Sequence, residues 1–271
     1  MKTQLFITLM TVLLFVLSSL KSIAGGDGNG DPDVNIHVFE NGETWTVCSF
    51  ILNSSLTQSE LARLTREAGN ILYFQPLTPA SLLGKFKFEV SLGYEFTPID
   101  QTSGAWNNTF AHPDDEHWLG DAVVFPYLQA RMGLTDRLEI GGYVVKNFGA
   151  NYGFWGTDLK YTFFSDTVKH WYAAYRLSYT MLYGPADLSL NSTGMDVLLS
   201  KRLGKFEPYV GGSLGLNHAK ETTEKLNLNT VNEFVPRALA GMQFLSGWFT
   251  AGVEYDVSIE NTFSIKIGGT F

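Results

Sequence analysis

The densest cluster of side chains that could bind a metal ion or transfer a proton lies at residues 112–117, which read His-Pro-Asp-Asp-Glu-His. Carboxylates and imidazoles bind divalent cations, and Asp and His side chains within hydrogen-bond reach of each other can activate water. The residues that could take part are His112, Asp114, Asp115, His117 and His218. The cluster has no recognised metal spacing, and a solvated acidic loop has the same composition. We therefore assign no catalytic residue, metal site or cofactor, and we expect no enzymatic activity.

A second set of polar side chains alternates with large apolar residues from Leu83 to Phe271. In the first such run, aromatic and aliphatic residues occupy every second position from Phe86 to Phe96, and charged, Ser and Gly residues lie between them. Because residues two apart on a strand share a face, this period predicts strands with one apolar and one polar face. The charged residues that we expect on the polar face are Lys87, Glu89, Arg131, Glu139, Asp158, Lys160, Arg176, Arg237, Glu254 and Lys266.

The alternation recurs often enough for about ten strands, each near the roughly 9 to 11 residues that a tilted strand needs to cross a bilayer. The period alone does not distinguish a soluble barrel with an apolar core from a membrane barrel with a polar interior. Volume does, because about four to six large apolar side chains per strand exceed what such a barrel can enclose at protein packing density. The sequence therefore predicts an all-β fold, a transmembrane antiparallel up-and-down β-barrel whose charges line the lumen.

The connections between the predicted strands alternate in length. Every second one is a tight turn, at Gly133–Asp136, Phe164–Lys169, Leu203–Lys205 and Leu245–Gly247. The others are mostly longer, at Thr97–Gly120, Asn147–Gly153, Gly184–Thr193 and Asn217–Val231, although the last, near Ser258–Asn261, is short. Antiparallel neighbours place alternate connections at opposite ends. We therefore expect a barrel with tight turns at one end and long loops at the other.

Composition agrees with this reading. Aromatic residues make up 14% of the chain and charged residues 17%, and there are 27 glycines, which favours many strands over a helical enzyme. The formal net charge of −8, without a basic cluster, argues against a nucleic-acid partner. The single cysteine, Cys48, allows no intramolecular disulfide.

The first 24 residues have the features of a signal peptide. Lys2 supplies a positive start, Leu5 to Leu17 is almost entirely apolar, and Ser22-Ile23-Ala24 offers small residues for cleavage after Ala24. The apolar run is shorter than the roughly 20 residues that a membrane-spanning helix needs. We expect residues 1–24 to be removed on export.

Residues 25–82 form a separate N-terminal region. Gly25 to Asp33 reads as a linker, and Asn41-Gly42 between the β-prone runs 34–39 and 44–52 predicts a hairpin. Thr57 and Glu60 form a capping box, and Gly69 is placed to stop the helix. The sequence thus predicts one short helix over residues 58–68, as a periplasmic cap or a lumen plug. The barrel follows at residues 83–271.

Two stretches resemble a known superfamily. The run from Gln129 to Gly142 resembles the strand–turn–strand unit of outer-membrane β-barrel proteins, and Ile267-Gly268-Gly269-Thr270-Phe271 is similar to the end of small Gram-negative, porin-like barrels. The resemblance implies an outer-membrane location in the cell envelope, tight turns and both chain ends in the periplasm, and Phe271 as an assembly signal. The partners it implies are outer-membrane lipids, lipopolysaccharide and the barrel assembly machinery. It leaves the oligomeric state open.

Three functions fit such a barrel. The first is a narrow channel or transporter for small polar solutes, with the charged lumen setting selectivity. The second is a structural or adhesive barrel that binds a surface partner through its outer loops. The third is a hydrolase at the outer rim, built from the histidine and acidic residues at 112–117. The sequence alone does not choose a substrate or ligand.

Overall fold

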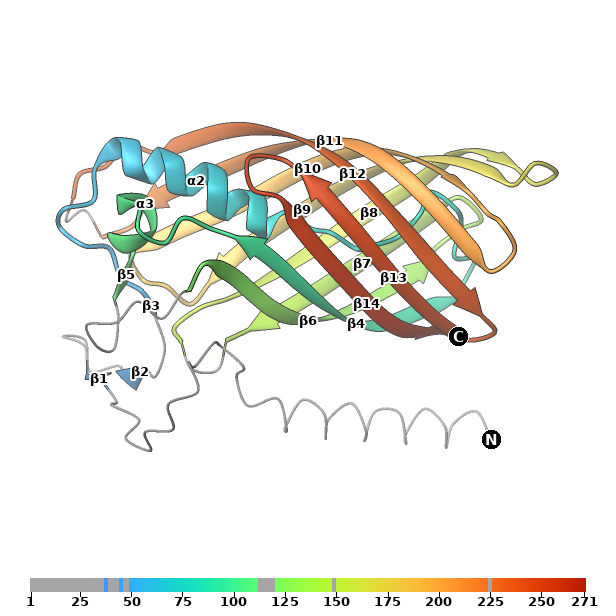
Figure 1. Cartoon of the computed structure of the whole chain (residues 1–271), viewed down its shortest axis with the longest axis horizontal. Coiled ribbons are helices and arrows are strands. Elements are labelled where there is room, and N and C mark those ends of the chain that lie inside the picture. Colours follow the sequence, from blue (N-terminus) through green and yellow to red (C-terminus); the bar gives the residue numbers. More distant parts are fainter. Residues whose placement is uncertain (1–36, 39–43, 46–48, 112–119, 148–149, 224–225) are drawn as a thin grey trace.

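Ten strands of the chain close into one barrel (Figure 1). The computed structural model describes residues 37–38, 44–45, 49–111, 120–147, 150–223 and 226–271. The ten barrel strands are β4 (Phe88–Pro98), β6 (Ala122–Gly133), β7 (Leu138–Lys146), β8 (Gly153–Asp166), β9 (Trp171–Tyr183), β10 (Leu188–Lys201), β11 (Phe206–Glu221), β12 (Val231–Ser246), β13 (Phe249–Val257) and β14 (Thr262–Thr270). This confirms the predicted ten-stranded, antiparallel, up-and-down barrel.

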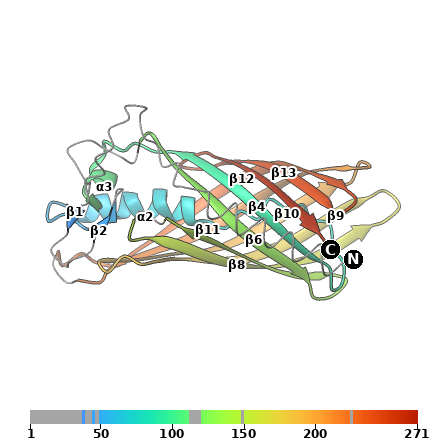
Figure 2. The same ribbon diagram turned by 90° about the horizontal axis from the view of Figure 1, so that it is seen from below.

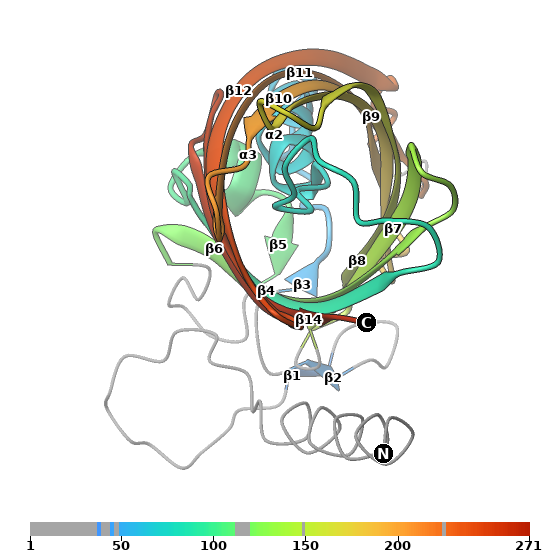
Figure 3. The same ribbon diagram turned by 90° about the vertical axis from the view of Figure 1, so that its right-hand side faces the viewer.

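Each strand pairs with its neighbours in the barrel, and the last strand closes onto the first. β14 pairs with β4 from Phe263↔Phe96 to Thr270↔Glu89, so the first and last strands are not left as edge strands. Figure 3, viewed along the barrel, shows the closed ring of strands with a helix inside it. Pairing with two neighbours satisfies most of the strand backbone groups within the barrel, as strands in a bilayer require.

The outer face of the barrel is apolar. Leu177, Val210 and Ile267 are 55%, 53% and 60% exposed, and aromatic residues such as Tyr94 and Phe263 share this face. The polar positions between them point inward and are buried. An apolar surface of this extent, on a barrel whose interior is polar over much of its length, is suited to contact with acyl chains.

The two ends of the barrel differ, as the connections predict. At the end that holds the C-terminus, here called the turn end, the links are residues 134–137, 167–170, 202–205 and 247–248. At the other, the loop end, they are 99–121, 147–152, 184–187, 222–230 and 258–261. The link expected at 184–193 is shorter because β10 begins at Leu188. Most of the difference in link length between the two ends comes from two links, 99–121 and 222–230.

The N-terminal helix α2 (Gln58–Leu72) lies at the loop end, within the ring of strands (Figures 1 and 2). Its capping box forms as predicted, since Glu60 N donates to Thr57 Oγ1 at 3.3 Å and Thr57 N donates to Glu60 Oε2 at 2.7 Å. The predicted stop at Gly69 is wrong, because the helix continues to Leu72. Gly69 instead faces Asn217, where a Cβ atom would lie 2.3 Å from the Asn217 Cγ.

Several short elements lie outside the ring of barrel strands. α3 (Gly104–Asn107) lies in the first long link, and β3 (Ser49–Phe50) pairs with β5 (Phe110–Ala111). β1 (His37–Val38) pairs with β2 (Thr44–Trp45). The Asn-Gly turn predicted at 41–42, the signal peptide and the linker lie outside the described residues. None of the helices in the described part of the chain is long and apolar enough to cross a membrane.

Candidate functional site: the filled barrel interior

Nine of the ten charged residues expected in the lumen are buried inside the barrel, each 5% exposed or less. Lys87 differs, because it is exposed and lies before β4 rather than on it. Gly84 and Phe86 have positive φ angles of 101° and 60°, so the chain turns there and the first strand starts at Phe88. The alternating pattern around Phe86 therefore extends beyond the strand that it predicts.

The charges near the turn end form a connected network. Arg131 Nη1 lies 3.1 Å from Asp158 Oδ1, and Arg131 Nη2 lies 3.4 Å from Glu139 Oε2. Lys160 Nζ lies 3.0 Å from the same Glu139 oxygen. The four side chains thus compensate one another across β6, β7 and β8. Buried charges are tolerated only when they are paired in this way.

Further pairs continue the network around the barrel. Lys266 Nζ lies 2.6 Å from Glu89 Oε1, and Arg237 Nη2 lies 3.1 Å from Asp256 Oδ1. Arg176 pairs with Asp196, and Tyr209 donates to Glu254 Oε2 at 2.7 Å. Asp196, Glu207 and Asp256 are further buried acidic residues with ion-pair partners, and they are not among the ten charged residues predicted from the sequence. The signal for them was the same alternation, since each lies on the inward face of its strand.

An extended stretch after α2, here called the lumen segment (Tyr73–Leu83), runs through this network. Lys160 Nζ donates to the Pro79 and Ser81 carbonyl oxygens, both at 2.8 Å. Lys266 Nζ and Gln129 Nε2 donate to the Pro76 carbonyl at 3.3 and 3.1 Å. Because the lumen segment has no helical or sheet hydrogen bonds of its own, the barrel wall supplies its partners.

Tyr73, at the start of the lumen segment, is held by residues of β10 and β12. Its hydroxyl donates to Asp196 Oδ1 at 2.7 Å, and the Arg237 guanidinium lies 4.2 Å from its ring centroid. A Cβ atom at Gly194 would lie 2.4 Å from Tyr73 Cζ, so β10 needs glycine there to admit the ring.

The interior of the loop end is apolar, which the alternating pattern does not predict. The apolar face of α2, including Leu61, Leu64 and Ile71, joins a buried cluster with strand residues such as Phe125 and Phe154. The rings of Phe74 and Tyr143 stack with centroids 4.4 Å apart, and Tyr143 donates to the Leu72 carbonyl at 3.1 Å. This cluster has no alternating signal, because its strand positions are apolar on both faces.

A small layer of residues covers α2 at the loop end. Trp106 Nε1 donates to Glu67 Oε2 at 2.6 Å, and the Trp106 ring stacks on Phe110 with centroids 6.0 Å apart. Phe50 packs on Phe110 with centroids 4.1 Å apart. The first long link and β3 therefore close the barrel above the helix.

The residues considered for metal binding or hydrolysis are not brought together by the described structure. His112, Asp114, Asp115 and His117 lie outside the described residues. His218 Nδ1 is 2.8 Å from Asn232 Oδ1, at a half-buried position on β11. Among the described residues no three His, Cys, Asp or Glu side chains are grouped to hold a metal ion.

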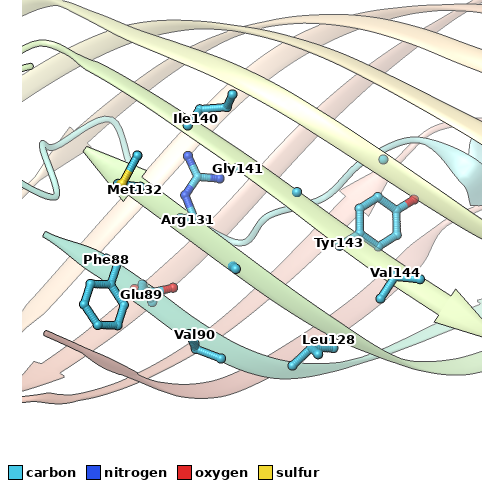
Figure 4. Close-up of a pocket in the computed structure, with 13 residues that line it drawn as sticks. Phe88, Glu89, Val90, Leu128, Arg131, Met132, Ile140, Gly141, Tyr143 and Val144 are labelled. Carbon is cyan, nitrogen blue, oxygen red and sulfur yellow. The ribbon is translucent and has the colours of Figure 1, made fainter. Parts of the chain in front are cut away.

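The outer face carries a shallow hollow of about 560 Å³ between β4, β6 and β7 (Figure 4). Large apolar side chains, among them Phe88, Met132 and Ile140, border it, and the small residues Ala130 and Gly142 leave the space between them. It lies on the face suited to acyl chains rather than in the interior. The terminal Phe271, the expected assembly signal, stacks on Phe88 nearby with centroids 5.2 Å apart.

Comparison with known proteins gives neither a family nor an activity. No protein-family model and no curated protein matches the sequence. Similar solved structures include the attachment invasion locus protein Ail of Yersinia pestis, bound to sucrose octasulfate, which is 15% identical over 69% of this chain and 99% of its own, with a TM-score of 0.31. The NanC porin is 13% identical over 67% of this chain and 98% of its own, with a TM-score of 0.33.

A loop-deletion variant of OmpT, an outer membrane protein of Vibrio cholerae, is 8% identical over 69% of this chain and 98% of its own, with a TM-score of 0.31. Identities and TM-scores this low say nothing about what the present chain binds. Ail, NanC and OmpT are outer-membrane β-barrel proteins, and the present chain forms a closed ten-stranded antiparallel barrel.

Proposed function

We propose that this protein is an outer-membrane barrel that is closed by its own N-terminal region and that holds its long loops at the cell surface, where they bind a partner. The apolar outer face and the tight turns at the end that holds the C-terminus support this location, with the turn end in the periplasm. This is the structural or adhesive barrel among the functions that the sequence allows.

The observation that carries the proposal is the filled interior. Every residue from Ala68 to Ser81 is buried, although the stretch lies inside a barrel that could have held water. The charged wall residues around it are equally covered, with Arg176 at 0% and Glu139 at 1% exposure. A water-filled passage would leave such side chains exposed to solvent.

An open channel for small polar solutes fits this interior poorly. Selectivity in a channel depends on charges that face a hydrated path, whereas these charges pair with each other and with the lumen segment. Loops positioned by a rigid scaffold, in contrast, are a common location for binding residues. Two links at the loop end are long, and the layer formed by Trp106, Phe110 and Phe50 anchors the first of them on the barrel.

Planar-bilayer recordings of the purified full-length protein test the closed barrel. We expect no discrete conductance steps from the wild-type protein at neutral pH. Stable, reproducible steps would overturn the proposal and favour the channel. A second measurement tests the surface role: cells that carry the protein are scored for adhesion to immobilised polysaccharides and matrix proteins.

The loop variant for that assay replaces residues 112–117 by Gly and Ser at equal length, and the control replaces 134–136 at the turn end in the same way. We expect adhesion to fall for the first and to persist for the second. Two outcomes count against a binding role of the long loops. One is adhesion that depends on the protein but falls equally for both replacements, and the other is an absence of protein-dependent adhesion.

A further inference from the structure

We infer that the chain crosses the membrane inside its own barrel, so that Ser49 to Thr57 lie on the cell surface together with the long loops that bind the partner. The inference rests on the proposed function for its orientation, with the turn end in the periplasm and the loop end outside. It adds a feature that a closed barrel does not require. The residues before α2 leave the barrel at the loop end, whereas the first strand, β4, starts at the turn end.

The crossing begins at the turn end. Leu83 N donates to Glu139, and Ser81 Oγ donates to Glu207 Oε2 at 2.9 Å. Glu139 and Glu207 are the second residues of β7 and β11, directly after two of the tight turns. The last residues of the lumen segment therefore lie at the turn end, next to the start of β4.

The middle of the crossing follows the wall upward. Lys266 and Gln129 hold the Pro76 carbonyl, and Tyr73 reaches Asp196. Arg237 Nη1 donates to the Asn70 carbonyl at 3.0 Å. These wall residues lie in the interiors of their strands, away from either end.

The upper part of the crossing meets the links of the loop end one after another. Asn70 Nδ2 donates to the Glu260 carbonyl at 2.8 Å, in the link between β13 and β14. Arg63 Nη2 lies 3.2 Å from Asp100 Oδ2, in the first long link. Gln58 Nε2 donates to the Asn229 carbonyl at 3.1 Å, in the link between β11 and β12. The helix therefore begins at the loop end.

The residues before the helix are bonded among the loops and not to the turn end. Ile51 N and Asn53 N donate to the Thr109 and Asn108 carbonyls at 3.0 and 2.8 Å. Phe50 N donates to Asn151 Oδ1 at 2.9 Å, and Leu52 N to Asp187 Oδ2 at 3.3 Å. Three different outer links thus fix the stretch from Ser49 to Asn53, and Asn53, Ser54 and Ser55 are exposed.

The length of the stretch is sufficient for one full crossing. The 15 residues of α2 span about 22 Å at 1.5 Å per residue. The 11 residues of the lumen segment add up to about 36 Å if extended, against an apolar band about 25 Å tall. Because residues 49–83 are described without a gap, they make a single pass and do not return to the turn end.

Cysteine labelling in whole cells tests the inference on the full-length protein. In a Cys48→Ser background, Ser54→Cys reports on the stretch before the helix. Thr230→Cys, exposed in the link before β12, is the loop-end reference, and Lys169→Cys, exposed in the turn between β8 and β9, is the turn-end reference. A bulky, membrane-impermeant maleimide is applied to intact cells and to cells with a permeabilised outer membrane.

We expect Ser54→Cys to be labelled in intact cells to the same extent as Thr230→Cys, and Lys169→Cys only after permeabilisation. If Thr230→Cys is labelled but Ser54→Cys requires permeabilisation, the crossing is refuted while the location of the barrel stands. If Lys169→Cys is labelled in intact cells and Thr230→Cys is protected, the orientation in the proposed function is itself wrong.

A second variant covers the case in which the thiol at position 54 fails to react. A protease site inserted between Ser54 and Ser55 is exposed to added protease in both preparations. Cleavage in intact cells supports the crossing. Cleavage only after permeabilisation, or none in either preparation, overturns it.

Discussion

The two halves of the barrel interior hold the same N-terminal stretch by different means. At the loop end, aliphatic and aromatic side chains surround the apolar face of α2. At the turn end, ion pairs and hydrogen bonds surround the lumen segment. The change from apolar to charged wall coincides with the end of the helix near Leu72 and Tyr73.

The difference follows from the backbone of each stretch. A helix satisfies most of its own N–H and C=O groups, so an apolar wall can pack directly against its apolar side chains. An extended stretch has no such internal bonds, and Pro76 and Pro79 lack an N–H altogether. The lumen segment therefore offers more acceptors than donors. Lys160, Lys266 and Gln129 supply the donors, and Glu139 and Glu89 balance the charge of the two lysines.

Lys160→Met should break the charged half and have the largest effect. The substitution removes the two bonds to the lumen segment and one of the two ion pairs of Glu139, whose remaining ion pair is with Arg131. Removing one partner from a buried pair costs about 3–5 kcal/mol. Urea unfolding of the protein in detergent micelles, followed by tryptophan fluorescence, measures the loss. Lys169→Met, at an exposed turn position, is the matched control, and an equal change in both variants would show that the network contributes little.

Leu64→Ala tests the apolar half, with a smaller expected loss. Leu64 is fully buried on α2, and truncating a buried leucine costs roughly 2–5 kcal/mol depending on how well the site collapses. The loss should fall at the low end of that range, because the helix can shift within an apolar wall. The control is Leu203→Ala, which is 54% exposed. A loss larger than that of Lys160→Met would reverse the ranking of the two halves.

The same contrast explains what sequence reasoning could reach. Alternation requires one polar face, so it predicted the strands and the inward position of residues such as Arg131 and Glu254. It could not find Phe125, Tyr143 or Phe154, because their strands are apolar inside as well as outside at the loop end. The apolar interior packs against the helix, and no local sequence pattern indicates which strands a helix distant in sequence will contact.

The helix itself shows a similar limit. Thr57 and Glu60 predicted its start correctly, because a capping box is a local hydrogen-bond pattern. Gly69 was read as its stop, since glycine is common after a helix C-terminus. The actual reason for glycine is the close approach of Asn217 from β11, a contact between residues far apart in the sequence. The alternating pattern also predicts the wrong place for Lys87. The pattern continues through residues 84–87, but the backbone turns at Gly84 to Phe86 and the strand starts only at Phe88.

Gly69→Ala sharpens the comparison at the point where the helix meets the wall. An added Cβ would overlap the Asn217 side chain, and overpacking of a tight site typically costs about 1–3 kcal/mol. Gly212→Ala is the matched control, because nothing lies within 4 Å of a Cβ there. The difference between the unfolding midpoints of the two variants measures the cost of the added Cβ at position 69. Equal midpoints would mean that Asn217 moves away at no cost and that the helix is loosely held.

The capping box at the exposed start of α2 should contribute least, because it touches neither half of the wall. Thr57→Ala removes the acceptor for Glu60 N, a loss of about 1 kcal/mol.

The Thr57 N–H donates to the Glu60 carboxylate and lowers the pKa of that group. The folded state therefore gains from the carboxylate above its ordinary pKa of about 4.3, and this gain is lost as the pH falls through the lowered pKa. Unfolding midpoints of the wild type and Glu60→Gln between pH 7 and pH 3 should converge toward the acid end. A gap that stays constant over this range would show that the charge of Glu60 plays no part in holding the helix start.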